Sequence, residues 1–234
     1  MSVGLKWTSG REPSRSRLRQ GWGPESFCQL LEKRYRDELD DRAKQYIDFA
    51  VDGAKRMQAL ISDLLAFSRV GRHRDTATVV SAADLVDEAR RNLALTLESA
   101  GAEVEVGELP EIKGEARLLV TVFQNLIGNA VKFRSEQTPH VRVDAEPGEA
   151  GEWVFSVRDN GIGIEEQYAE RIFVIFQRLH TKDKCPSTGI GLAMSRKIIE
   201  HHGGRMWLDT ARTGGTTIHF TLPQIDSHVP ISAG

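Results

Sequence analysis

The stretch Asp159-Asn160-Gly161-Ile162-Gly163-Ile164 decides how this chain is interpreted. It follows the run 153–157, Trp-Val-Phe-Ser-Val, whose β-branched and aromatic residues predict a strand. A carboxylate at a strand end beside two glycines can build a binding site, because glycines permit a sharp turn and leave room for a flat ligand. Asp159 could then accept a hydrogen bond from an amino group of that ligand. A strand that simply ends in a polar turn has the same composition, so this stretch alone leaves both interpretations open.

Two further segments favour a binding site. Asn125, Asn129 and Lys132 recur at helical spacing, which would place amide oxygens, good ligands for a hard cation, beside a positive charge suited to phosphate. In the run 187–192, Gly189 and Gly191 precede a predicted helix, whose first N–H groups can bind phosphate. Each segment has an ordinary alternative, since asparagines on helices are usually solvated and Gly-x-Gly is usually a turn.

In this order the segments resemble the ATP-binding catalytic domain of sensor histidine kinases, a branch of the gyrase–Hsp90–histidine kinase–MutL superfamily. The asparagine segment resembles the family's N box, and the segments 159–163 and 188–192 resemble its two glycine boxes. The segment 172–178 resembles its phenylalanine box, and the run 176–181, Phe-Gln-Arg-Leu-His-Thr, resembles the phytochrome-like branch. The resemblance covers residues 25–223, and it implies a Bergerat-type ATP-binding fold.

The resemblance also implies the ligands, ATP and Mg²⁺, and the residues that bind them. Asp159 would accept the adenine amino group, Asn129 would hold Mg²⁺, and Asn125, Lys132 and Arg178 would act on the phosphates. The remaining residues implied in nucleotide binding are Gly161, Gly163, Phe173, Phe176, Thr188, Gly189, Gly191 and Leu192. Residues 165–187 would form a lid that the two phenylalanines anchor, although ordinary core packing explains those phenylalanines equally well. Lys182 and Lys184 are further candidates to meet the terminal phosphate, whereas His180, His201 and His202 are expected to be solvated.

The pattern of helices and strands predicts an α+β fold, an α/β sandwich whose mixed sheet is covered by helices on one face. We expect an irregular basic segment at 1–24, a helical region at 25–73, an ATP-binding domain at 74–225 and a flexible tail at 226–234. The predicted helix 82–99 is the first helix of that domain. At 234 residues with a formal net charge of −2, the chain gives no reason to expect nucleic acid as a partner. It has no long apolar run and two cysteines without metal-ligand spacing, so we expect a cytoplasmic location without a membrane span.

The helical region carries a heptad seam, which predicts a homodimer through a helical bundle, although a helix packed on its own domain is the alternative. The seam residues are Ile47, Ala50, Ala54, Met57, Ile61, Leu64 and Ser68. The family's phosphate acceptor is a histidine on the first helix of this bundle. Here no histidine precedes His73, which lies in the expected linker. A truncated or frame-altered N-terminus would produce this pattern.

Three functions remain open at this stage. The first is a kinase fragment that phosphorylates a histidine on another chain and works with a response regulator. The second is an ATP-binding and dimerisation module without catalysis that modulates partner kinases. The third is an ATP hydrolase related to gyrase or Hsp90. Because Thr121 stands where those hydrolases have a water-activating glutamate, the third is disfavoured.

Overall fold

The computed structural model describes residues 40–71, 77–177, 188–211 and 214–225, with the side chains of Arg69 and Ala150 left aside. The chain divides into two compact units, Met1–Ala59 and Leu60–Gly234. Helix α2, Asp41–Arg69, begins in the first unit and ends in the second. No helix among the described residues is long and apolar enough to cross a membrane.

The described part of the first unit belongs to α2. Its first turn is capped because the Asp40 Oδ1 atom accepts a hydrogen bond of 2.7 Å from the Ala43 N–H. Val51 and Ala54 are buried, whereas Met57 is 55% exposed. In the second unit, the same helix exposes Ile61 and Leu64. Within the helical region predicted at 25–73, the described residues form a helix over Asp41–Arg69, and residues 25–39, 72 and 73 lie outside the described part.

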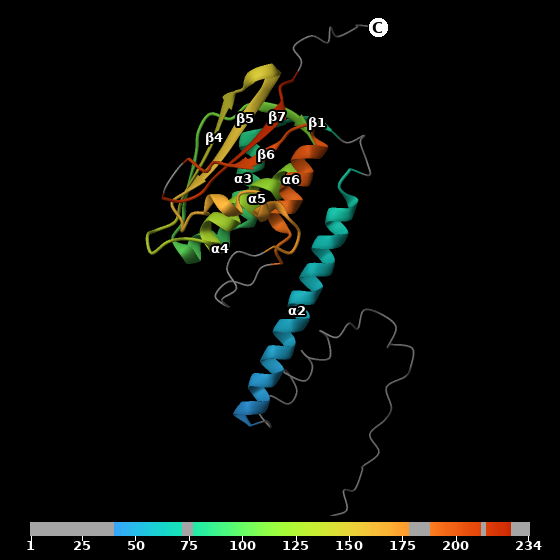
Figure 1. The fold of residues 1–234 in the computed structure, drawn as a ribbon, viewed down its shortest axis with the longest axis vertical. Coiled ribbons are helices and arrows are strands. Elements are labelled where there is room, and N and C mark those ends of the chain that lie inside the picture. The colour runs from blue at the N-terminus through green and yellow to red at the C-terminus, as the bar shows by residue number, and fades with distance from the viewer. Residues whose placement is uncertain (1–39, 72–76, 178–187, 212–213, 226–234) are drawn as a thin grey trace, which may run out of the picture. The chain divides into compact units, whose positions relative to one another are not determined.

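The second unit is a mixed five-stranded sheet with helices on one face, as predicted (Figure 1). Its strands are ordered β2-β4-β5-β7-β6, with β2 and β4 parallel and the other pairs antiparallel. The strand bounds are β2 Glu103–Val106, β4 His140–Pro147, β5 Glu152–Asp159, β6 Met206–Leu208 and β7 Thr217–Pro223. Strands β1, Thr78–Ser81, and β3, Glu111–Gly114, pair separately as an antiparallel ribbon.

The helices of this unit are α3, Ala82–Asn92, α4, Ala94–Ala100, α5, Ala116–Lys132, and α6, Gly191–His201. Their apolar faces meet one face of the sheet because strand residues alternate between its two sides. Phe155 of β5 and Phe220 of β7 are fully buried there and stack with ring centroids 4.9 Å apart. Phe123 of α5 meets Phe220 edge to face at 5.7 Å, so α5 is fixed over the centre of the sheet.

One predicted element is wrong in detail. The single helix expected at 82–99 is two helices, α3 and α4, with Leu93 between them at φ −99° and ψ 5°. The break brings the Leu93 side chain over α5, where a Cβ added at Gly128 would lie 3.9 Å from the Leu93 Cδ2 atom. Leu93 thus packs over the glycine of the neighbouring helix, a contact that local sequence does not specify.

Candidate functional site

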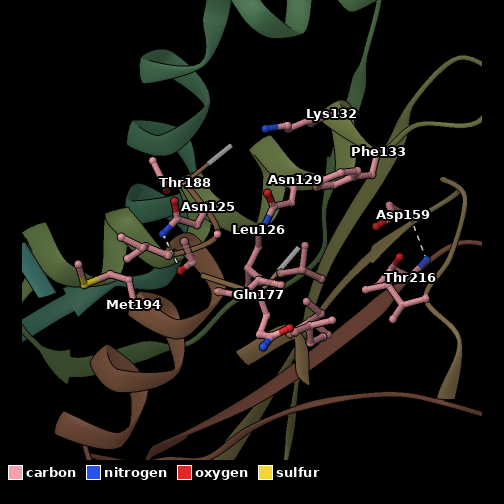
Figure 2. A pocket seen from close by; sticks show the side chains of 18 of the residues that line it. Asn125, Leu126, Asn129, Lys132, Phe133, Asp159, Gln177, Thr188, Met194 and Thr216 are labelled. Carbon is pink, nitrogen blue, oxygen red and sulfur yellow. Dashed lines mark hydrogen bonds between the residues drawn. The ribbon is translucent and has the colours of Figure 1, made fainter. Parts of the chain in front are cut away.

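A pocket of about 500 Å³ lies between α5, the end of β5, the start of β7 and the turn that precedes α6 (Figure 2). Nine of the predicted site residues line it: Asn125, Asn129, Lys132, Asp159, Gly163, Thr188, Gly189, Gly191 and Leu192. The wall is otherwise largely apolar and includes Leu126, Phe133 and Ile218. Polar groups that converge on an apolar pocket of this size are typical of a small-molecule site.

Four predicted residues do not belong to the described wall. Phe173 is buried in the core at 6% exposure, whereas Phe176 is 58% exposed at φ 66°. Arg178 lies outside the described residues, together with the rest of the expected lid from 178 to 187. Gly161 is buried behind the wall, where an added Cβ would lie 2.5 Å from the Phe133 carbonyl oxygen. The space that a side chain at Gly161 would need is therefore occupied by the main chain of Phe133.

Asp159, the last residue of β5, is held from two sides. Its Oδ1 atom accepts hydrogen bonds from the Gly161 N–H at 2.8 Å and from the Thr216 N–H at 2.9 Å. Gly215 allows the second bond, because its φ is +100° and an added Cβ would collide with the Asp159 carbonyl oxygen. The carboxylate orientation is thus fixed by main-chain donors from two segments.

Three polar side chains project from one side of α5 into the pocket (Figure 2). The Asn125 Nδ2 atom donates to the Gly191 carbonyl at 3.2 Å and to the Ser195 hydroxyl at 3.3 Å. The ammonium group of Lys132 lies 5.6 Å from the centroid of the Phe133 ring. Asn129 faces the pocket between them.

The turn before α6 brings main-chain groups to the other side of the pocket. Gly189 adopts φ +71°, and its carbonyl accepts a hydrogen bond of 3.0 Å from the Phe176 N–H. The N-cap of α6, Ile190, makes no side-chain hydrogen bond to the first turn. This turn therefore presents N–H groups that an anion can bind. Thr188 donates its hydroxyl proton to the Asp63 carboxylate at 2.7 Å.

The side chains near the pocket suit a hydrated hard cation better than a fully protein-ligated one. No cluster of three or more His, Cys, Asp or Glu residues within the described ranges has metal-binding geometry. Asn129 lines the pocket, and its amide carries an oxygen of the kind that hard cations bind. Mg²⁺ commonly takes one or two protein oxygens and completes its shell with water and phosphate. The donor set therefore fits a magnesium ion that arrives with a phosphorylated ligand.

The expectation that His201 and His202 are solvated is wrong. The Glu115 N–H donates to the His202 Nε2 atom at 3.0 Å, and the Nδ1 atom of that ring lies 2.7 Å from the Ile198 carbonyl. The neighbouring His201 ring contacts the Glu115 carboxylate at 2.8 Å. Burial, aided by the neighbouring His201, lowers the pKa of His202 below its ordinary value. The pair joins the start of α5 to the end of α6; His180 lies outside the described residues.

Four contributors to the site were not predicted from the sequence: Phe133, Ser195, Gly215 and Thr216. The pair Gly214-Gly215 before a β-branched strand was a usable signal, since two glycines often mark a position where backbones approach closely. Ser195 had no comparable signal, because a serine inside an amphipathic helix is unremarkable in sequence.

Two models of known protein families match this chain. A family model described as histidine kinase-, DNA gyrase B- and HSP90-like ATPase matches residues 114–226. A second, the His Kinase A (phospho-acceptor) domain, matches residues 25–72.

Individual relatives cover most of this chain, whereas the chain covers only part of each. Phytochrome-like protein Cph1 of Synechocystis sp. is 46% identical over 198 residues, which are 85% of this chain and 26% of that protein. Sensor histidine kinase WalK of Bacillus subtilis is 30% identical over 199 residues, 80% of this chain and 31% of WalK. The crystal structure of full-length ShkA in complex with AMPPNP matches with a TM-score of 0.64 at 24% identity, over 84% of this chain and 41% of ShkA. This structural likeness confirms the fold.

Proposed function

Since this chain belongs to the sensor histidine kinases of two-component signalling, we propose that it binds Mg–ATP and transfers the terminal phosphate to a histidine on another chain. The chain spans about a quarter of the length of Cph1. Kinase activity like that of such longer proteins is therefore proposed for this chain. A cytoplasmic site of action, where ATP is available, belongs to the same proposal.

Asp159 is the observation that carries ATP binding. Two main-chain N–H groups engage its Oδ1 atom, and the carboxylate stands in the wall of a largely apolar pocket. We assign its second oxygen as the acceptor for the adenine amino group. An acceptor held in advance in this way loses little entropy on binding, which favours a purine that donates at this position.

The phosphates would extend from the adenine toward the turn before α6. Asn129 would hold Mg²⁺ through its amide oxygen, and Lys132 would neutralise phosphate charge. Main-chain N–H groups at Gly189 and Gly191 would complete the phosphate site. We propose Arg178 for the terminal phosphate on resemblance alone, because it lies outside the described residues. Bound Mg²⁺ would neutralise charge that develops on the transferred phosphoryl group.

The acceptor is proposed to come from another chain. The phospho-acceptor domain matches residues 25–72, yet that span contains no histidine. In-line phosphoryl transfer needs a nucleophile positioned against the terminal phosphate, so this chain without a partner would stop at ATP binding. We propose that the exposed apolar residues of α2, among them Met57 and Ile61, form a homodimer interface. A response regulator would take the phosphate from the partner's histidine.

Labelling with γ-labelled ATP and Mg²⁺ tests the proposal. The chain is incubated alone and with a bundle fragment that carries an acceptor histidine but no catalytic domain. We expect acid-labile, base-stable phosphate on the fragment and none on this chain. Phosphate on this chain that disappears in His73→Ala would show that the linker histidine is the acceptor. If ATP binds but neither chain is labelled, the protein is a binding module without catalysis.

A further inference from the structure

Ser195 lies one helical turn after Gly191 on α6 and is completely buried. Its hydroxyl donates to the Gly191 carbonyl at 3.1 Å and accepts a hydrogen bond from the Asn125 Nδ2 atom at 3.3 Å. Asn125 Nδ2 also donates to the Gly191 carbonyl at 3.2 Å. Three polar groups thus form one cluster that joins α5 to the first turn of α6. Asn125 and Gly191 of this cluster line the pocket.

The cluster determines which end of the Asn125 amide faces the pocket. A carbonyl oxygen can only accept, so the amide nitrogen must be the atom that faces Gly191. The Ser195 hydroxyl donates its proton to the same Gly191 carbonyl. The hydroxyl oxygen can therefore accept a proton from the Asn125 amide nitrogen. Both partners therefore hold the Asn125 nitrogen against the first turn of α6, and its Oδ1 atom lies beside Gly191, where an added Cβ would be 3.5 Å from it. Asn129 and Lys132 project from the same side of α5 (Figure 2).

We propose that Ser195 is a positioning residue for the magnesium–triphosphate group, acting through Asn125. It holds the Asn125 oxygen toward the metal and phosphates, and it ties the phosphate-binding turn of α6 to the metal-binding helix α5. The inference rests on the proposed function and adds a residue that makes no direct contact with the ligand. Ser195 does not line the pocket, so an effect on nucleotide binding would have to pass through its neighbours.

This arrangement separates the two ends of the nucleotide site. The adenine end depends on Asp159, whose hydrogen-bond partners lie on the loop after β5 and before β7. The phosphate end depends on α5 and α6, which the Ser195 cluster joins. Loss of the hydroxyl should therefore weaken binding of Mg–ATP and leave binding of adenosine unchanged. A general loss of folding would weaken both.

The test compares Ser195→Ala with Ser195→Cys by calorimetry, using adenosine, ATP with EDTA and ATP with Mg²⁺. The thiol fills the volume of the hydroxyl but is a weak hydrogen-bond acceptor, so cavity formation and hydrogen-bond loss are distinguished. We expect both variants to bind Mg–ATP about threefold to tenfold more weakly, the factor that one net hydrogen bond supplies. The matched control is Ser99→Ala, which removes a similar local helix bond, Oγ to the Thr96 carbonyl, far along the chain from the cluster.

A double variant separates action through Asn125 from a direct or structural effect. In an Asn125→Ala background, Ser195→Ala should cause no further loss of Mg–ATP affinity, because the group that it positions is gone. Additive losses, restored binding in Ser195→Cys, or equal losses for adenosine and Mg–ATP would each overturn the inference. If the parent chain binds adenosine nucleotides with no magnesium-dependent gain, the inference falls together with the metal site. Parent-like binding in both serine variants would overturn the inference and leave the proposed function standing.

Discussion

Replacing Asp159 by Asn changes one hydrogen-bond acceptor in the pocket while keeping the shape of the side chain. The Gly161 and Thr216 N–H groups both point at Oδ1, at 2.8 and 2.9 Å. In the variant these donors should select the amide oxygen, because the amide nitrogen would present protons to them. The nitrogen must then occupy the other position, where we assign the acceptor for adenine. A donor would face the adenine amino group, which is itself a donor.

The magnitude follows from the bonds that are lost in each variant. A hydrogen bond to a charged group is worth about 1.5–3 kcal/mol, so Asp159→Asn should weaken ATP binding roughly 10- to 100-fold or more. Its fold should be nearly unchanged, because both main-chain donors keep an oxygen. Asp159→Ala leaves two half-buried N–H groups without their acceptor, at about 1–3 kcal/mol each. The alanine variant should therefore also melt several degrees lower.

Calorimetry and thermal melting of the three proteins distinguish these effects. The asparagine variant should melt close to the parent, bind ATP poorly and bind inosine triphosphate better than the parent does, since the purine 6-oxygen accepts the new donor. Equal ATP affinity in the parent and in a folded Asp159→Asn protein would refute the assignment of Asp159. A large drop in melting temperature for the asparagine variant would refute the account of its two main-chain donors.

Three further predictions concern the metal, the dimer and the half-buried His202. Asn129→Ala should lose the magnesium-dependent gain in ATP affinity and keep its circular dichroism spectrum, whereas an unfolded variant would make Asn129 structural. Ile61→Asp should shift sedimentation from dimer to monomer, because an unpaired carboxylate is strongly unfavourable in an apolar seam. The control variant Ser62→Asp should remain dimeric. A parent chain that is monomeric at high micromolar concentration would contradict the dimer. Burial lowers the pKa of His202 below 6.5, so near this pH the unfolded chain binds a proton at His202 more readily than the folded chain does. The free energy of unfolding should therefore fall as the pH drops below 6.5. The melting temperature should depend less on pH between 7.5 and 5.5 in His202→Gln than in the parent, and identical pH profiles in the two proteins would contradict this role of His202.

Local sequence was enough to predict the elements that carry the site. The asparagines at 125 and 129 sit on one helix face because their spacing is set by the helix itself. Asp159 ends β5 because the apolar run stops there and glycines follow. The mixed sheet is also as expected. These features depend on residues that are close together in the chain.

What surrounds those residues was decided by tertiary structure, because the contacts join distant positions. The Thr216 N–H meets the Asp159 carboxylate across 57 residues, and Ser195 meets Asn125 across 70. His202 accepts from the Glu115 N–H across 87 residues, so its ring is half-buried and hydrogen-bonded instead of solvated. Periodicity predicts the face of the helix or strand on which a residue lies. Only the packing of the sheet and helices determines which group of another element that residue contacts. The sequence therefore identified the polar groups of the site, and the tertiary structure supplied the partners that orient them.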